Sequence, residues 1–282
     1  MLHSPNMEKR NARIIAFTNW KGGVGKTTTC VNLSAFLVES GKRVLIVDLD
    51  PQGNASIGLG IPPRKAKTIY NVISEDCDIS EAVQLTPMKG LEIIPADIDL
   101  AGAEEELVRA SGRERILKNI LDKIRPSYDY ICIDCPPSLG LLPVNALTAA
   151  DALIIPIQCE FYAMEGIAQL MYTIKLIKKR LNPDLTIDGV LLTMEARGNL
   201  TEQVATEILK YFGKIVFKTR IPRNIRLAEA PSHGKPINLY DRRCAGAVAY
   251  QNLCKEFLTR QKSQAVVETF YNAPKASSRP PT

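Results

Sequence analysis

The stretch from residue 21 to residue 28 carries the residue types with the clearest chemistry. It reads Lys21-Gly22-Gly23-Val24-Gly25-Lys26-Thr27-Thr28. Glycine lets a backbone turn sharply, so that its N–H groups can approach a dense negative charge such as a triphosphate. The Lys-Thr pair after the glycines supplies an ammonium group for the β and γ phosphates and a hydroxyl for Mg²⁺. All eight residues are therefore predicted to bind a nucleoside triphosphate, with Lys26 on phosphate and Thr27 on the metal.

This loop departs from the common phosphate-binding spacing at its start. The common form has a glycine where this chain has Trp20, and Lys21 is a second lysine that an ordinary loop lacks. The flanking residues support the assignment, because Arg13 to Thr18 reads as a buried strand. Apolar residues then recur at helical spacing from Val31 to Leu37, so a helix is expected to begin near Gly25. The loop is predicted to be a variant form in which the second lysine meets another copy of the chain.

Acidic residues at two strand ends could complete a nucleotide-hydrolysing site. Asp48 and Asp50 end one apolar run, and two residues that are two apart in an extended chain point the same way. Asp134 ends a second apolar run, from Tyr130 to Ile133. Hydrolysis needs oxygen ligands for Mg²⁺ and a water placed in line with the γ phosphate. Asp134 is predicted to hold the metal, directly or through water.

Composition fits one α/β domain. The chain has 282 residues, 45% of them hydrophobic, and no apolar run long enough to span a bilayer. The first eleven residues are polar and do not resemble a signal segment. The seven cysteines lack paired spacing, which indicates reduced thiols in a cytoplasm. Cys132-x-x-Cys135 has no second pair after it, so zinc or redox chemistry is not favoured.

The positive charge of the chain is concentrated in one late segment. Residues 196–243 hold ten Lys or Arg and four Asp or Glu, an excess of six that equals the net charge of the whole chain, +6. A local cationic excess points to a polyanionic partner more directly than the overall charge does.

Apolar runs alternate with helical patterns along most of the chain. This order predicts an α/β fold, with a mainly parallel twisted sheet, helices on both faces and ligands at the carboxyl ends of the strands. Residues 1–12 are expected to be a flexible tail, residues 13–262 a single domain and residues 263–282 a disordered tail. The expected strands are 13–18, 44–47, 91–95, 130–133, 152–157 and 186–192, and the expected later helices are 115–124, 161–181, 201–212 and 246–260.

Several stretches together resemble the ParA/Soj partitioning ATPases, which belong to the deviant-Walker group of P-loop NTPases that includes MinD. The loop at 21–28 is followed by Val-Asp-Leu-Asp-Pro-Gln-Gly-Asn at 47–54 and Ile-Asp-Cys-Pro-Pro-Ser at 133–138. Further similar stretches are 100–104, 158–163 and 221–232. The resemblance covers about residues 13 to 260.

The resemblance implies ATP and Mg²⁺ as cofactors and a homodimer in the ATP-bound state. Lys21 would reach the phosphates of the partner protomer, and Gly22 would lie near the dimer interface. Asp50 would position the attacking water, with Asp48 supporting the metal beside Asp134. The segment 222–224 would border the adenine through Pro222, Arg223 and Asn224.

The resemblance also gives the basic segment a partner. ATP-bound dimers of this family hold double-stranded DNA without sequence preference, and phosphate contact needs charge rather than base edges. A ParB-type centromere-binding protein would stimulate slow hydrolysis and release the dimer, so the protein would be cytoplasmic and nucleoid-associated with ATP. The candidate DNA contacts are Arg197, Lys218, Arg220, Arg226 and Lys235.

Two other functions stay open at this point. A MinD-type positioning ATPase would need a basic amphipathic membrane helix, whereas the last helix here places Ala247, Tyr250, Cys254, Phe257 and Leu258 on one apolar face typical of core packing. An iron–sulfur enzyme similar to the nitrogenase iron protein would need cysteines that bridge a cluster. Cys135 lies near such a place, but its surroundings do not match that pattern.

Overall fold

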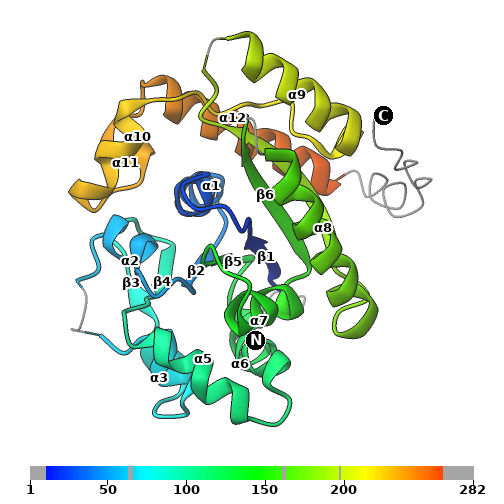
Figure 1. Cartoon of the computed structure of the whole chain (residues 1–282). Coiled ribbons are helices and arrows are strands. Elements are labelled where there is room, and N and C mark those ends of the chain that lie inside the picture. The colour runs from blue at the N-terminus through cyan, green and yellow to red at the C-terminus, as the bar shows by residue number, and fades with distance from the viewer. Residues whose placement is uncertain (1–10, 63–65, 161–162, 197, 263–282) are drawn as a thin grey trace, which may run out of the picture.

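The computed structural model describes residues 11–62, 66–160, 163–196 and 198–262, and in these ranges one seven-stranded sheet forms the centre of the fold (Figure 1). The strands lie in the order β3-β4-β2-β5-β1-β6-β7, and every pairing is parallel except that of β3 with β4. Their bounds are β1 Arg13–Phe17, β2 Val44–Asp48, β3 Gln84–Leu85, β4 Leu91–Ile94, β5 Tyr130–Asp134, β6 Ala152–Gln158 and β7 Thr186–Thr193.

Helices cover both faces of the sheet and make two apolar cores (Figure 1). One core contains residues of α1 (Lys26–Glu39), α2 (Asn54–Gly58), α10 (Ile225–Glu229), α11 (Ile237–Tyr240) and α12 (Ala245–Lys262). The other contains residues of α3 (Ile69–Ile73), α4 (Ile79–Ala82), α5 (Leu100–Arg109), α6 (Ile116–Ile124), α7 (Leu141–Ala149), α8 (Ala163–Arg180) and α9 (Asn199–Phe212). The described ranges also contain four short 3₁₀ turns: η1 (Arg113–Arg115), η2 (Arg125–Ser127), η3 (Gly213–Ile215) and η4 (Ala230–His233).

The strands read as continuous apolar runs because both of their faces are buried. In β1, Ile14 belongs to one core and Ile15 to the other, and both are fully buried. In β2, Leu45 and Ile46 divide in the same way. A strand covered by helices on both sides has no solvent face, so in the central strands β1, β2, β5 and β6 no charged residue interrupts the run.

Strand register brings the acidic strand ends together. Asp48, the last residue of β2, is paired with Asp134, the last residue of β5. Phe17, which ends β1, is paired with Asp134 from the other side. The glycine loop therefore starts next to both aspartates, at the carboxyl edge where ligands of such sheets bind.

The structure confirms the predicted fold class and all six expected strands, each within one residue at either end. The expected helices are present with shifts of one or two residues, and the apolar face of α12 is in the core. Most short helices had no prediction, and residues 76–87 contain α4 and the antiparallel edge strand β3. Most of the two expected tails lies outside the described residues. Among the described helices, none is long and apolar enough to cross a membrane.

Phe257 on α12 offers a test of this packing. Its ring is fully buried and meets Tyr130 edge-on at 5.8 Å between ring centroids. Phe257→Ala should lower the free energy of unfolding by about 3–5 kcal/mol, because it removes buried area and leaves a cavity. Denaturant titration measures this loss. Val248→Ala, at an exposed position of the same helix, is the control and should change stability by less than ~1 kcal/mol.

Candidate active site

A hollow of about 500 Å³ lies at the carboxyl edge of the sheet. Its walls come from the segments that follow β1, β2, β5 and β7, and from η4. The residues that line it are Gly22, Gly23, Gly25, Lys26, Thr27, Thr28, Asp50, Gln52, Asn54, Ile57, Pro137, Met194, Pro231 and Ser232. Most of the predicted loop residues therefore face a single open space.

The glycine loop ends in a helix N-terminus that points at this hollow. Gly25 is the N-cap of α1 with φ of 86°, a left-handed conformation that favours glycine. The Thr193 hydroxyl at the end of β7 donates a hydrogen bond of 2.8 Å to the carbonyl oxygen of Val24, which fixes the loop from the side. Free N–H groups and the helix dipole make this end of α1 a suitable place for phosphate.

The two lysines of the loop have different surroundings. The Lys26 ammonium is buried and donates a 3.0 Å hydrogen bond to the carbonyl oxygen of Lys21. Burial lowers the pKa of Lys26, and the nearby Asp134, Cys135 and Asp50 oppose that change. Lys21 forms an ion pair with Glu160, and the side chains are 41% and 48% exposed. Exposed pairs contribute roughly 0–1 kcal/mol, so a phosphate can readily displace Glu160.

Asp134 is a fully buried carboxylate with few partners. Neither of its oxygens receives a hydrogen bond of standard geometry from the described residues, although the Thr27 hydroxyl is close enough to lower its pKa somewhat. Burial, followed by the charge of Asp48, raises the pKa of Asp134 well above its usual range. A buried carboxylate beside a hydroxyl offers oxygen ligands that suit Mg²⁺. The positive charge of the metal would stabilise the ionised carboxylate, which burial disfavours.

Asp48 is equally buried but is held by protein donors. Its Oδ2 accepts hydrogen bonds from the Ser56 amide at 2.9 Å and the Ser56 hydroxyl at 2.7 Å. Its Oδ1 accepts one from the Asp50 amide at 3.2 Å. Burial raises its pKa to about 6, although the bonds from Ser56 oppose that rise. These hydrogen bonds join Asp48 to the start of α2, and they fit a carboxylate that lies behind the metal ligands and supports them.

Asp50 lies at the edge of the hollow, two residues beyond Asp48. It lines the space and accepts a 3.0 Å hydrogen bond from the Gln52 amide, which fixes the direction of its carboxylate. Its role in orienting a water near the γ phosphate stays a prediction.

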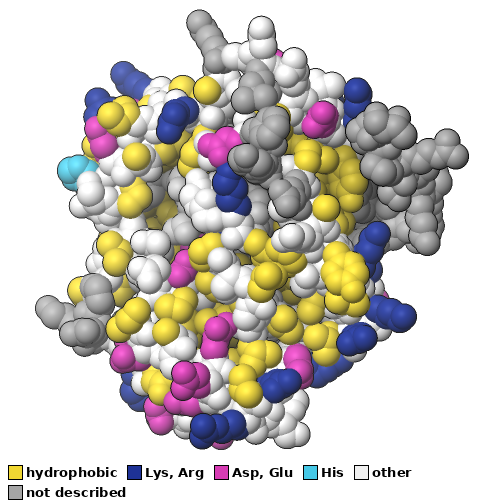
Figure 2. Space-filling view, in the orientation of Figure 1, with side chains coloured by type: hydrophobic (Ala, Val, Ile, Leu, Met, Phe, Trp, Pro, Cys, Tyr) yellow, Lys and Arg dark blue, Asp and Glu magenta, His cyan; other side chains and the backbone are white. Residues whose placement is uncertain are grey.

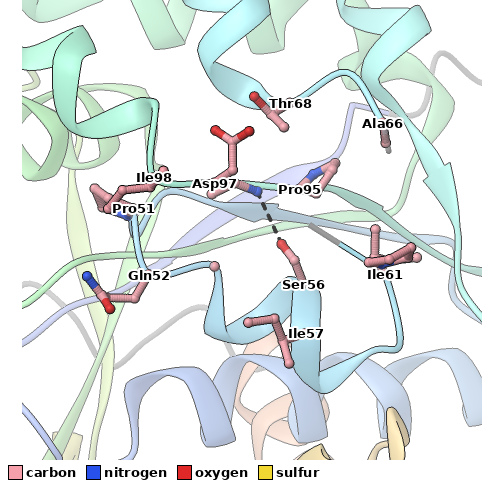
Figure 3. Close-up of a pocket in the computed structure, with 13 residues that line it drawn as sticks. Pro51, Gln52, Ser56, Ile57, Ile61, Ala66, Thr68, Pro95, Asp97 and Ile98 are labelled. Carbon is pink, nitrogen blue, oxygen red and sulfur yellow. Dashed lines mark hydrogen bonds between the residues drawn. The ribbon is translucent and has the colours of Figure 1, made fainter. Parts of the chain in front are cut away.

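A second cavity of about 250 Å³ lies behind the same wall (Figure 3). Gln52 and Ile57 line both spaces. Ser56 lines the second cavity, and its hydroxyl donates a hydrogen bond to Asp48 and accepts one of 3.1 Å from the Ala96 amide. The start of α2 is thus tied to the ends of two strands.

The wall beyond β7 contains residues that had no predicted role in the site. Pro222, Arg223 and Asn224 are not among the residues that line the hollow; Met194, Pro231 and Ser232 are. Asn224 instead caps α10 by accepting a 3.0 Å hydrogen bond from the Arg226 amide. Met194 directly follows β7, so the rule that ligands bind at strand ends could have identified it.

Lys and Arg side chains gather on the corner formed by α10 and α11 (Figure 2), where Arg226 lies on α10 and Lys235 follows η4. Lys218 and Arg220 lie instead beside Glu256 of α12 and Glu202 of α9. Arg226 pairs with Glu229 at 2.8 Å, and Arg220 pairs with Glu195 at 2.6 Å. Lys218 and Lys235 are exposed, and neither has an acidic partner among the described residues. Arg197 lies outside the described residues.

Comparison with known proteins identifies the family. A family model described as an AAA domain matches residues 12–187. The chain is 57% identical over 246 residues to the sporulation initiation inhibitor protein Soj of Bacillus subtilis, covering 86% of this chain and 97% of that protein. It is 48% identical over 262 residues to the chromosome partitioning protein ParA of Caulobacter vibrioides, covering 92% and 98%. The chain belongs to the Soj/ParA family of partitioning ATPases.

Solved structures agree with this Soj/ParA assignment in fold. A Mycobacterium smegmatis protein named cobyrinic acid a,c-diamide synthase, with bound ADP and magnesium, is 38% identical with a TM-score of 0.80, covering 92% of this chain and 99% of that one. Pyrococcus furiosus MinD is 24% identical with a TM-score of 0.74 and covers 88% and 99%. The likeness to MinD concerns the fold alone. The synthase name denotes another reaction, in a protein less similar than the partitioning relatives.

The two cysteines of the Cys132-x-x-Cys135 pair lie inside this Soj/ParA fold. Cys132 and Cys135 are buried thiols, and burial raises the pKa of both. Within the described ranges, no three His, Cys, Asp or Glu side chains form a group that could hold a metal by themselves. A Mg²⁺ ion would therefore depend on nucleotide oxygens as well as on Thr27 and the two aspartates.

Asp134→Asn tests how far the burial of this carboxylate lowers the stability of the folded chain. Because the pKa of Asp134 is raised in the folded chain, its contribution to stability is lost as pH rises through that pKa. The nucleotide-free variant should therefore melt a few degrees above wild type, by a margin that widens with rising pH. Thermal unfolding across pH measures this margin, and Asp99→Asn, at an exposed position, is the control. An Asp134→Asn variant less stable than wild type at every pH would contradict the conclusion that the buried carboxylate destabilises the fold.

Proposed function

We propose that this chain is an ATP-dependent DNA-partitioning ATPase whose ATP-bound dimer holds double-stranded DNA without sequence preference. The observation that carries the proposal is the position of η4: Pro231 and Ser232 line the nucleotide hollow, while the basic residues Arg226 and Lys235 flank the same turn. Nucleotide and DNA would thus be bound by two sides of one segment. The ADP and magnesium in the similar Mycobacterium smegmatis structure support the choice of ligand.

Each residue of the site would have one task in hydrolysis. The amides of the glycine loop and Lys26 would bind the β and γ phosphates, and Lys26 would leave the Lys21 carbonyl to do so. Thr27 and Asp134 would hold Mg²⁺, with Asp48 behind them. The metal would supply charge neutralisation to the phosphates. Asp50 would orient the water, and hydrolysis would be slow in the absence of a partner protein.

The second lysine would make the active site depend on a dimer. Lys21 is the exposed lysine of the loop, and its bond to Glu160 is weak enough to exchange for a phosphate across an interface. Gly22 would lie near that interface. A cation supplied in trans stabilises the transition-state charge of phosphoryl transfer.

The basic corner, together with Lys218 and Arg220, would bind DNA through phosphates. Lys218 and Lys235 would contact them directly, whereas Arg220 and Arg226 would exchange a carboxylate for a phosphate. A dimer doubles this surface, so several weak contacts together give affinity that falls with salt. A ParB-type protein would accelerate hydrolysis and so release the dimer from DNA. This proposal would associate the ATP-bound protein with the nucleoid.

Lys21→Ala tests the role of the second lysine. ATP binding should change less than about 3-fold because Lys26 and the loop amides remain, whereas ATP-dependent dimerisation and hydrolysis should each fall by roughly 10-fold or more. Light scattering with ATP and a phosphate-release assay measure these effects. Lys89→Ala removes an exposed lysine elsewhere and should leave both unchanged. Full dimerisation of Lys21→Ala would refute a role in trans.

Arg226→Ala tests the basic corner. Wild type should bind a duplex of arbitrary sequence with ATP, but not with ADP or without nucleotide. The variant should bind at least ~10-fold more weakly, with a shallower dependence on salt because a phosphate contact is lost. Gel shifts at several salt concentrations measure this, with Arg109→Ala, at an exposed position of α5, as the charge-matched control. Equal wild-type affinity in all nucleotide states would overturn the proposed switch.

A further inference from the structure

Two backbone segments meet without side chains between them at the junction of the nucleotide hollow and the basic corner. Gly60 follows α2, and Gly234 follows η4. A Cβ added at Gly234 would lie 2.8 Å from the Gly60 Cα and 3.1 Å from the Gly60 nitrogen. Both glycines have left-handed φ, 76° and 61°. At Gly234 there is no room for a Cβ, and at Gly60 the left-handed φ favours glycine, so the two segments meet through their backbones.

One side of this contact belongs to the metal side of the active site. The two hydrogen bonds from Ser56 to Asp48 anchor α2, and the Gly53 amide donates a 2.8 Å hydrogen bond to the Asp50 carbonyl. Ile57 of α2 lines the nucleotide hollow. A change in the position or charge of the two aspartates would therefore move α2, and Gly60 lies two residues after its end.

The other side of the contact belongs to the basic corner. The chain runs without interruption from α10, which carries Arg226, into η4 and then to Gly234 and Lys235. The Lys235 amide closes the turn by donating a 3.3 Å hydrogen bond to the Ala230 carbonyl. Pro231 rests near Gly58, where an added Cβ would be 3.5 Å from the Pro231 ring. The turn is compact and small, so a shift at Gly234 would also move the two cations.

We propose that the Gly60–Gly234 contact is a positioning joint, through which the nucleotide-dependent position of α2 sets the positions of Arg226 and Lys235 on DNA. This inference rests on the proposed function and adds a second route from nucleotide to DNA, within one protomer, to the route through dimerisation. Neither glycine lines the nucleotide hollow, so they would act through the segments they join. Rigid contact of two backbones transmits small shifts, because no flexible side chain can absorb them.

Gly234→Ala tests the joint, with Gly41→Ala as the matched control. Both positions have left-handed φ, 61° and 80°, so alanine brings similar backbone strain, but an added Cβ at Gly41 meets nothing within 4 Å. With ATP, Gly234→Ala should bind duplex DNA at least ~10-fold more weakly than the control, while nucleotide affinity and ATP-dependent dimerisation stay within about 2-fold of it. Gel shifts, fluorescent-nucleotide titration and light scattering measure the three quantities.

Two results would overturn the joint. The first is DNA affinity of Gly234→Ala equal to that of the control, and the second is a parallel loss of nucleotide binding or dimerisation, which would make the contact part of the nucleotide site. If Gly234→Ala does not fold, the same measurements are made on Gly60→Ala. The Cβ of this variant would lie 3.4 Å from the Gly234 carbonyl oxygen and disturb the contact less. Wild-type protein that fails to bind DNA with ATP would refute the proposed function instead, which keeps the two failures distinct.

Discussion

The pair of carboxylates buried in register at the ends of β2 and β5 is the constraint on which the rest of the site depends. Asp48 and Asp134 are adjacent and fully buried, so charge on one disfavours charge on the other. The fold stabilises the two carboxylates to different extents. Asp48 receives three protein hydrogen bonds, whereas Asp134 is left for Thr27, the nearby Lys26 ammonium and an incoming cation. A site built in this way favours Mg²⁺ together with its nucleotide, and it distributes different tasks to residues of the same type.

The main architecture could be predicted from the sequence because it rests on strong periodic signals. Strands buried on both faces give unbroken apolar runs such as Ile14 to Phe17, and parallel strands place their carboxyl ends at one edge. From these two facts alone the loop, Asp48 and Asp134 were expected to meet. The same reasoning could not give the short helices, since α2, α10 and α11 have only four or five residues each and too few turns to show a period.

Contacts between distant segments of the chain were also beyond prediction. Lys21 and Glu160 are 139 residues apart, and no local pattern links them. The wall formed by Met194, Pro231 and Ser232 depends on where η4 lies against α2, which is a matter of tertiary packing. The family resemblance placed the adenine near Pro222 to Asn224, and in the fold the Asn224 side chain also caps α10.

The ion pairs of the basic corner have a consequence for the balance of ions. An unpaired lysine that meets a phosphate frees the small cations condensed on the nucleic acid. In the proposed complex with DNA, Arg226, which is paired with Glu229 and Asp241, would exchange one anion for another and leave two carboxylates to recruit cations of their own. Cations taken up by the protein would then offset part of the cations released from DNA. Counting contacts from the dependence of affinity on salt would then give fewer phosphates than the protein touches.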